Sequence, residues 1–314
     1  MSATIEVGTM CSGTDVETIR RKISLAAQAG FSSVQVTLAR DASVSEWHEV
    51  FACCREYGLS LAAIGCYMSL LEPESRRLHG VSMQGALAAI EAAATSPGRP
   101  EGRGAPSGPA AQAGLWATRP QFVVWSGTLG KSLLAIHPGN FSPAAWDRAV
   151  ETAVDLVQRI AQLGGRLLVE PYYTHVLGRA RDYIHFFNEV ERRAAVAGAG
   201  AGGARAIGIV LDPPNLIDAE SLHDLDAWVD EVVARLGPHA GLAHFKDITL
   251  PPGGTELHPG LPKPGAGLMD YRRLTAALRA HAPAGRFVGI VEHHDENSLD
   301  ELKRLKAFVE DALA

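Results

Sequence analysis

The sequence predicts an α/β protein, folded as a single (β/α)8 TIM barrel that spans residues 1–314. Short apolar runs typical of buried strands alternate with longer amphipathic stretches typical of helices. Eight such pairs follow one another along 314 residues, a length that suits one barrel of this kind. Strand–helix alternation implies a parallel sheet with right-handed crossovers, and eight repeats favour a closed barrel over an open sheet.

Each predicted strand is a short apolar run between turn signals. In chain order these runs are 5–9, 33–38, 60–66, 121–125, 166–170, 207–212, 241–246 and 287–292.

The predicted helices lie between these strands and after the last one. They are 15–29, 44–57, 75–94, 143–163, 180–196, 221–236, 269–281 and 297–313. Asp15 precedes the first helix and Gly30 ends it, as expected of an N-cap and a C-terminal glycine. Ser142 and Pro143 open the fourth helix, and Ser298 can cap the last.

Three segments depart from this alternation. Residues 95–114 are rich in Pro, Gly and Ala and predict a surface insertion between the third helix and the fourth strand. Residues 195–205 predict a low-complexity loop on the side away from the active mouth. Residues 248–268 follow the seventh strand, so this long loop belongs to the active face.

Composition and charge exclude several classes of function. The formal net charge is −6 and there is no long Lys/Arg run, which argues against a nucleic-acid partner. No apolar run reaches the length of a membrane span, and the N-terminal MSATIEVGTM lacks the pattern of a signal peptide. The four cysteines include no CxxC pair and fit buried free thiols. A cytoplasmic protein with a small-molecule substrate is therefore expected.

Four residues with metal-binding side chains close four successive predicted strands. They are Glu170 in GGRLLVE, Asp212 in AIGIVLD, His244 in GLAHFKD and Glu292 in RFVGIVE. In a closed parallel barrel the C-terminal strand ends converge on one mouth. Each carboxylate alone can instead cap a helix or pair with an arginine. Four candidate ligands at successive strand ends, three carboxylates and one histidine, favour one divalent-metal site. Mn²⁺ is the first expectation, and Mg²⁺, Co²⁺ and Zn²⁺ are compatible with the same ligands.

Further candidates lie at or just past strand ends. Lys246 shares a strand face with His244 and can bind a substrate oxygen or polarise a carbonyl; a structural ion pair is the alternative. His137 can act as a general acid or base, unless it is an ordinary loop histidine. His175, Tyr67 and Trp125 can contact a sugar, although core packing is an equal alternative for Trp125.

The order of these motifs resembles a known family. LLVEPYYTH, IVLDPPNLID, LAHFKDI, PGAGLMDYRRL and GIVEHH are similar to the sugar phosphate isomerase/epimerase family, as is LAAIGCYMSLLEPESRR in the first half. The resemblance implies a xylose-isomerase-like TIM barrel in which Glu170, Asp212, His244 and Glu292 are the metal ligands. It also implies that Glu170 and Glu292 transfer protons.

The chain departs from the ketose 3-epimerases of that superfamily at two positions. They carry a second glutamate where this chain has Val176, and a histidine where it has Asn215, our candidate substrate contact. A free-sugar ketose 3-epimerase is therefore less favoured. The endonuclease branch needs additional histidines for a trinuclear zinc site, so DNA repair is not expected.

The resemblance leads to one main function and two alternatives. The main one is a metal-dependent isomerase or epimerase of a sugar, sugar phosphate, cyclitol or keto-sugar, acting through an enediolate. The first alternative is a lyase on the same scaffold, by inosose-type dehydration or by cleavage of a 3-keto or C-glycoside. The second is a binding protein on a barrel that has lost its activity. Such barrels often form homo-oligomers, and some C-glycoside-cleaving relatives pair with a small β-sandwich subunit.

Overall fold

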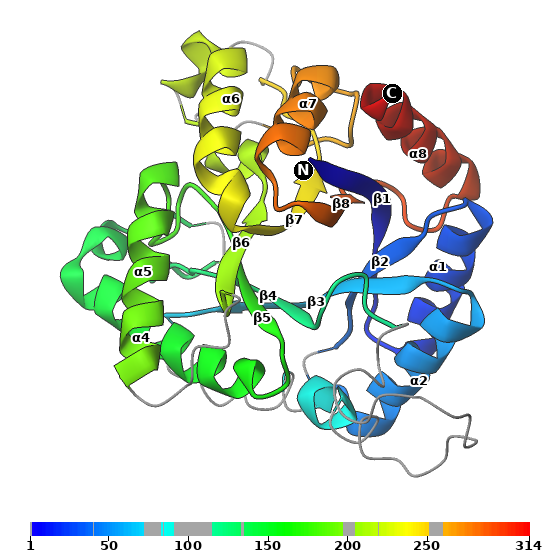
Figure 1. Ribbon diagram of the computed structural model, residues 1–314, viewed down its shortest axis with the longest axis horizontal. Helices are drawn as coiled ribbons and strands as arrows, with labels where there is room; N and C mark the ends of the chain where they lie inside the picture. Colours follow the sequence, from blue (N-terminus) through cyan, green and yellow to red (C-terminus); the bar gives the residue numbers. More distant parts are fainter. Residues whose placement is uncertain are drawn as a thin grey trace.

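Eight parallel strands close into a barrel, and helices pack around its outer wall (Figure 1). The computed structural model describes residues 2–39, 41–71, 83, 85–90, 115–132, 135–196, 205–218, 220–250 and 260–314. Each strand pairs in parallel with the next along the chain, and β8 closes the barrel on β1. The predicted TIM barrel is confirmed.

All eight predicted strands are present. They are β1 (Ala3–Ser12), β2 (Ser33–Thr37), β3 (Ser60–Ser69), β4 (Gln121–Trp125), β5 (Arg166–Glu170), β6 (Ile207–Leu211), β7 (Ala240–Phe245) and β8 (Gly285–Val291). β4 and β5 have the predicted bounds. β1 is longer than predicted because its ends pair with Gly285 of β8 and with Thr37 of β2, a non-local contact that a local apolar pattern does not reveal.

The helices alternate with these strands. They are α1 (Val16–Gln28), α2 (Val44–Glu56), α4 (Pro143–Ala161), α5 (Ala180–Val196), α6 (Leu225–Leu236), α7 (Tyr271–His281) and α8 (Leu299–Leu313). In the described part of the chain there are also four short 3-10 helices: η2 (Pro138–Phe141), η3 (Pro213–Leu216), η4 (Ser221–His223) and η5 (Gly237–His239). Of the described helices, none has both the length and the apolar character that spanning a bilayer requires.

Side-chain caps fix where several helices begin. Asp15 and Ser142 accept hydrogen bonds from the first turns of α1 and α4, and Ser298 does so for α8, as predicted. The predicted helix 221–236 is wrong in one respect, because it is divided into η4 and α6. Asp224 lies between them and caps α6 through the Ala227 N–H, so the chain leaves helical geometry at this residue.

Parts of several predicted segments lie outside the described residues. The insertion at 95–114 is one of them, so its structure remains a prediction. Within the predicted helix 75–94, residues 85–90 are helical. Residues 197–204 of the predicted loop 195–205 and residues 251–259 of the predicted loop 248–268 also lie outside the described residues.

Alternation along the strands divides the core into two layers. Leu167 and Val169 of β5 belong to the large layer between strands and helices. Leu168, between them, belongs to a smaller cluster inside the barrel. The other members of this interior cluster are Met10, Ala62, Ala63, Ala117, Val123, Val210, Leu242, Val288 and Ile290. Successive side chains of a strand point to opposite faces, so every second residue enters the barrel.

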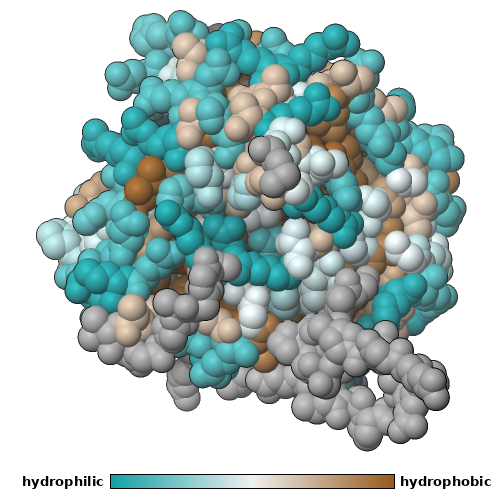
Figure 2. Space-filling model, in the orientation of Figure 1, coloured by the Kyte–Doolittle hydropathy of each residue, from teal (hydrophilic) through white to brown (hydrophobic). Residues whose placement is uncertain are grey.

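The protein surface in view in Figure 2 is mainly hydrophilic. The face in view in Figure 2 carries hydrophobic residues only in small, separate patches. Among the described residues the large exposed hydrophobic side chains are Val44, Leu129, Ile136, Phe141, Leu250, Leu268 and Phe308. Leu129, Ile136 and Phe141 belong to the segment between β4 and α4.

The interior cluster supports the barrel mouth, so truncating one of its leucines should destabilise the protein. Leu242 is fully buried, and Leu242→Ala removes its packing and leaves a cavity. We expect a loss of about 2–5 kcal/mol in the free energy of unfolding, measured by urea denaturation. The control is Leu268→Ala, at a leucine that is 52% exposed, with an expected change below about 0.5 kcal/mol. Equal effects of the two substitutions would contradict the assignment of Leu242 to the core.

Candidate metal centre

The alternation that fills the barrel also places four polar side chains at its mouth. Leu168, Val210, Leu242 and Ile290 lie inside the barrel on β5 to β8. Two positions further along each strand come Glu170, Asp212, His244 and Glu292, which therefore point inward at the C-terminal end. A shift of one residue in any of these strands would turn its ligand toward the helices instead.

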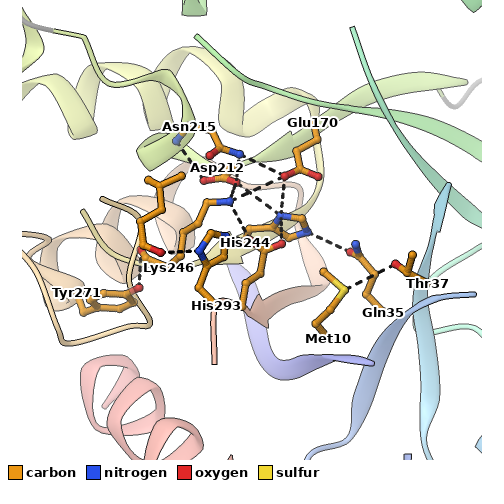
Figure 3. Close-up of polar contacts among 12 residues, drawn as sticks. Met10, Gln35, Thr37, Glu170, Asp212, Asn215, His244, Lys246, Tyr271 and His293 are labelled. Carbon is orange, nitrogen blue, oxygen red and sulfur yellow. Dashed lines mark hydrogen bonds and ion pairs between the residues drawn. The ribbon is translucent and has the colours of Figure 1, made fainter. Parts of the chain in front are cut away.

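The four side chains form one compact, buried cluster, of which Figure 3 labels Glu170, Asp212 and His244. Each offers a ligand atom, and these atoms all lie within 4.8 Å of one another. His244 Nδ1 is at the centre, 2.7 Å from Glu292 Oε1 and 3.6 Å from both Glu170 Oε1 and Asp212 Oδ2. The four residues are at most 6% exposed.

Gln35 fixes the orientation of the His244 ring. The fully buried side-chain oxygen of Gln35, on β2, lies 3.1 Å from His244 Nε2. Because an amide oxygen only accepts hydrogen bonds, Nε2 carries the proton, and a neutral ring then presents the lone pair of Nδ1 to the carboxylates. The sequence pattern did not single out Gln35, although it is the longest of the three polar side chains that alternate with valines in the buried run SVQVT.

Lys246 and Asn215 bind the same carboxylates. Lys246 Nζ lies 2.6 Å from Asp212 Oδ2 and 2.8 Å from Glu292 Oε2, and its side chain is buried. Asn215 donates from Nδ2 to Asp212 Oδ2 (2.7 Å) and to Glu170 Oε1 (3.2 Å). Lys246 therefore forms the ion pair that the sequence analysis gave as its alternative, and Asn215 links two members of the cluster.

The electrostatics of the cluster follow from burial and charge pairing. Burial lowers the pKa of His244, but the charges of Glu292 and Glu170 outweigh burial and raise this pKa well above its ordinary value. Burial also acts against ionisation of Glu292, yet His244 and Lys246 hold its pKa below the usual range. The pKa of Lys246 is raised because Asp212 and Glu292 overcome the effect of its burial.

The residues present fit a divalent cation. Glu170 Oε2 is buried and has no hydrogen-bond partner in the described part of the chain, and His244 Nδ1 faces the carboxylates. With His244 neutral, as a metal ligand must be, three carboxylates face the single positive charge of Lys246. The remaining excess of two negative charges equals the charge that a divalent cation would neutralise. The oxygen and nitrogen donors are those that such cations accept.

An aromatic group lies beside the cluster, on the ends of β4 and β5. Trp125 pairs in register with Glu170, and its ring meets the buried His175 edge-on at 6.1 Å. Tyr172 packs against His175 at 5.4 Å and against Tyr173 at 5.0 Å, both measured between ring centroids. The Gly127 N–H donates to His175 Nδ1. These four rings, from Trp125, Tyr172, Tyr173 and His175, are called the aromatic wall below.

Two candidates from the sequence are not brought to the cluster by any described contact. His137 is exposed, and its Nδ1 accepts a hydrogen bond from the Gly139 N–H as the cap of η2. This is the ordinary loop role that was its alternative. The side chain of Tyr67 lies outside what the structure describes, so its substrate contact remains a prediction.

His293 is a further residue at the mouth. It is the one non-glycine residue with positive φ in the described part of the chain, at 57°. Its Nδ1 contacts the Leu261 carbonyl oxygen, and its Nε2 lies 3.7 Å from Glu292 Oε2. The strained backbone turns this half-exposed ring back toward Glu292, a placement that the sequence pattern did not indicate.

Comparison with solved structures finds the same fold in sugar epimerases. The 3-keto-D-glucoside 4-epimerase from E. coli is 16% identical, with a TM-score of 0.62 over 98% of this chain and 100% of that chain. The D-allulose 3-epimerase from Methylomonas sp. is 14% identical, with a TM-score of 0.63 over 99% and 100%. An L-ribulose 3-epimerase is 15% identical, with a TM-score of 0.60 over 99% and 95%. Similarities at this level of identity establish the fold.

Family assignment comes from the sequence itself. No curated protein sequence matches the chain. The family model described as the xylose isomerase-like TIM barrel matches residues 125–310, which include β5 to β8 and all four members of the buried cluster. The match covers more than half of the chain, and the closed barrel agrees with it. The protein belongs to the xylose isomerase-like TIM barrel family.

Proposed function

We propose that the protein is a divalent-metal-dependent isomerase or epimerase of a sugar, cyclitol or keto-sugar. The observation that carries this proposal is the buried cluster of three carboxylates and one imidazole at the mouth of the barrel. The similarity of the fold to barrels named as sugar epimerases supports a carbohydrate substrate. Mn²⁺ suits this mixed set of oxygen and nitrogen ligands, as do Mg²⁺, Co²⁺ and Zn²⁺.

The ligands of the proposed site are Glu170, Asp212, His244 and Glu292. A divalent ion held by these four residues would supply Lewis acidity at the barrel mouth, which would polarise a substrate carbonyl and offset negative charge beside it. The aromatic wall described above then contacts the apolar face of the sugar, and His175 and Asn215 are the proposed polar contacts there. Asn215 suits this role because its buried Oδ1 has no hydrogen-bond partner among the described residues and can accept from a hydroxyl.

The two glutamates differ in a way that suggests separate roles. Glu170 Oε2 has no hydrogen-bond partner within the described structure. Glu292, in contrast, directs Oε1 toward His244 and Oε2 toward Lys246. The structure therefore favours Glu170 as the group that removes the carbon-bound proton beside the substrate carbonyl. Glu292 then returns a proton on the opposite side. Because Glu292 is ionised in the cluster, it first takes this proton from the ammonium group of Lys246, 2.8 Å from its Oε2, and Lys246 can also hold a substrate oxygen.

The lyase alternative differs in the fate of the same enediolate. The lyase would expel a leaving group instead of taking a proton back, and a dedicated base such as His137 would favour this outcome. The exposed position of His137 and its capping bond to Gly139 give that role no support from a described contact. The isomerase or epimerase is therefore the function that the geometry supports best.

The activity can be tested by incubating the Mn²⁺-loaded protein with keto-sugars and cyclitols in D2O. We expect carbon-bound deuterium together with an isomerised product. Glu170→Gln and Glu292→Gln should each slow this exchange by about 100-fold or more, because each removes a proton-transfer group. Glu189→Gln is the control, since Glu189 is a surface residue of α5 that pairs with Arg192 and Arg193. Full activity in either active-site variant would rule out its proton-transfer role, and release of a fragment would identify a lyase.

The orientation of His244 by Gln35 leads to a prediction about metal affinity. Gln35→Leu removes the acceptor that keeps Nε2 protonated and Nδ1 directed at the carboxylates. Loss of such a supporting hydrogen bond typically weakens metal binding by about 10- to 100-fold. Calorimetric titration of metal-free protein with Mn²⁺ measures the effect, and Gln28→Leu, on the exposed end of α1, serves as the control. Unchanged affinity in Gln35→Leu would mean that His244 does not depend on this bond.

A further inference from the structure

The ammonium group of Lys246 lies within the candidate metal centre (Figure 3). Its Nζ is 2.6 Å from Asp212 Oδ2, 2.8 Å from Glu292 Oε2 and 3.9 Å from Glu170 Oε1. The side chain is 2% exposed, so water screens these contacts very little. A metal ion bound by the same three carboxylates would therefore experience the charge of Lys246 at short range.

Lys246 also occupies a bonding position that a metal ion needs. A carboxylate oxygen has about two lone-pair directions. At Asp212 Oδ2 these two are taken by the Asn215 amide, at 2.7 Å, and by Lys246. Asn215 is held through its backbone, because its N–H bonds to Asp212 O and its carbonyl accepts from the Tyr173 N–H. The longer and more flexible lysine side chain is the partner that would move.

The backbone of Lys246 is anchored, so any movement of its ammonium group is confined to the reach of the side chain. Tyr271 Oη donates to the Lys246 carbonyl oxygen at 2.9 Å. The next residue, Asp247, accepts hydrogen bonds from the backbone N–H groups of Ile248, Gly265 and Met269. The ammonium group thus stays close to the cluster whichever carboxylate oxygens it contacts.

We propose that Lys246 competes with the metal ion for Asp212 and Glu292 and thereby sets the affinity of the centre for divalent cations. Lys246 keeps three buried carboxylates together before the metal binds, and it weakens metal binding because two like charges share the same oxygens. This role rests on the metal-dependent function proposed above. It makes Lys246 a determinant of metal affinity in addition to any contact with substrate.

The test is a calorimetric titration of metal-free protein with Mn²⁺ alone, without substrate. Lys246→Met keeps the length of the side chain and removes its charge. We expect it to bind Mn²⁺ at least about tenfold more tightly than the wild type. A tenfold change in affinity corresponds to only a small fraction of the Coulomb repulsion energy between such charges about 4 Å apart in a protein. Lys246→Arg keeps the charge and should stay within about threefold of the wild type.

Lys263→Met is the matched control for the loss of one positive charge. Lys263 lies in the loop after β7 and pairs with Glu301, so its removal leaves the cluster intact. Its Mn²⁺ affinity should equal that of the wild type. Unchanged or weaker Mn²⁺ binding by Lys246→Met would overturn the proposal. An increase in the Mn²⁺ affinity of Lys263→Met by the same factor as in Lys246→Met would overturn it as well.

Folding of the variants is followed by circular dichroism with and without Mn²⁺. A Lys246→Met protein that folds only when Mn²⁺ is present would support the proposal, because the metal then replaces the charge of the ammonium group. Failure to fold under both conditions would contradict it. If the wild type itself binds no divalent ion, the proposed function fails; if the wild type binds Mn²⁺ and Lys246→Met binds it no better, only the present inference fails.

Discussion

Mutual repulsion among three buried carboxylates is the constraint around which this site is organised. Glu170, Asp212 and Glu292 place ligand atoms within 4.8 Å of one another and of His244, almost out of contact with water. Charges in such an environment are costly unless they are paired. Lys246 and the side-chain amide of Asn215 supply the pairing that the chain itself can provide to the carboxylates. The remaining negative charge is what makes a divalent cation the natural complement of the cluster.

Strand alternation and barrel closure bring the carboxylates and the side chains that support them to one place. Side chains two positions apart on one strand share a face, so packing of Leu168 and Leu242 inside the barrel fixes the inward direction of Glu170 and His244. Closure brings the ends of β5 to β8 together with β2, which contributes Gln35 from far away in the sequence. The packed apolar side chains inside the barrel lie directly below the four cluster residues. Their packing therefore determines how accurately the cluster side chains are positioned.

The sequence predicted the parts of the site that depend on local pattern. Strand ends are marked by apolar runs followed by a polar residue, which is why the four cluster residues and the bounds of β4 and β5 were predicted correctly. Contacts between strands distant in sequence were not accessible in this way. The bond from His244 to Gln35, the bridge made by Asn215 and the positive φ of His293 all depend on register and loop path. The direct pairing of Lys246 with Asp212 likewise required the geometry of two strands at once.

Metal analysis of the purified protein, together with its Glu170→Ala and His244→Ala variants, tests the central claim most directly. After incubation with Mn²⁺ and removal of excess ion, elemental analysis gives the metal content per chain. One site formed by the four-residue cluster predicts about one equivalent in the wild type and loss of that equivalent in both variants, which each remove one ligand. A wild type that retains no divalent metal, or variants that retain all of it, would contradict the assignment of the cluster as a metal centre.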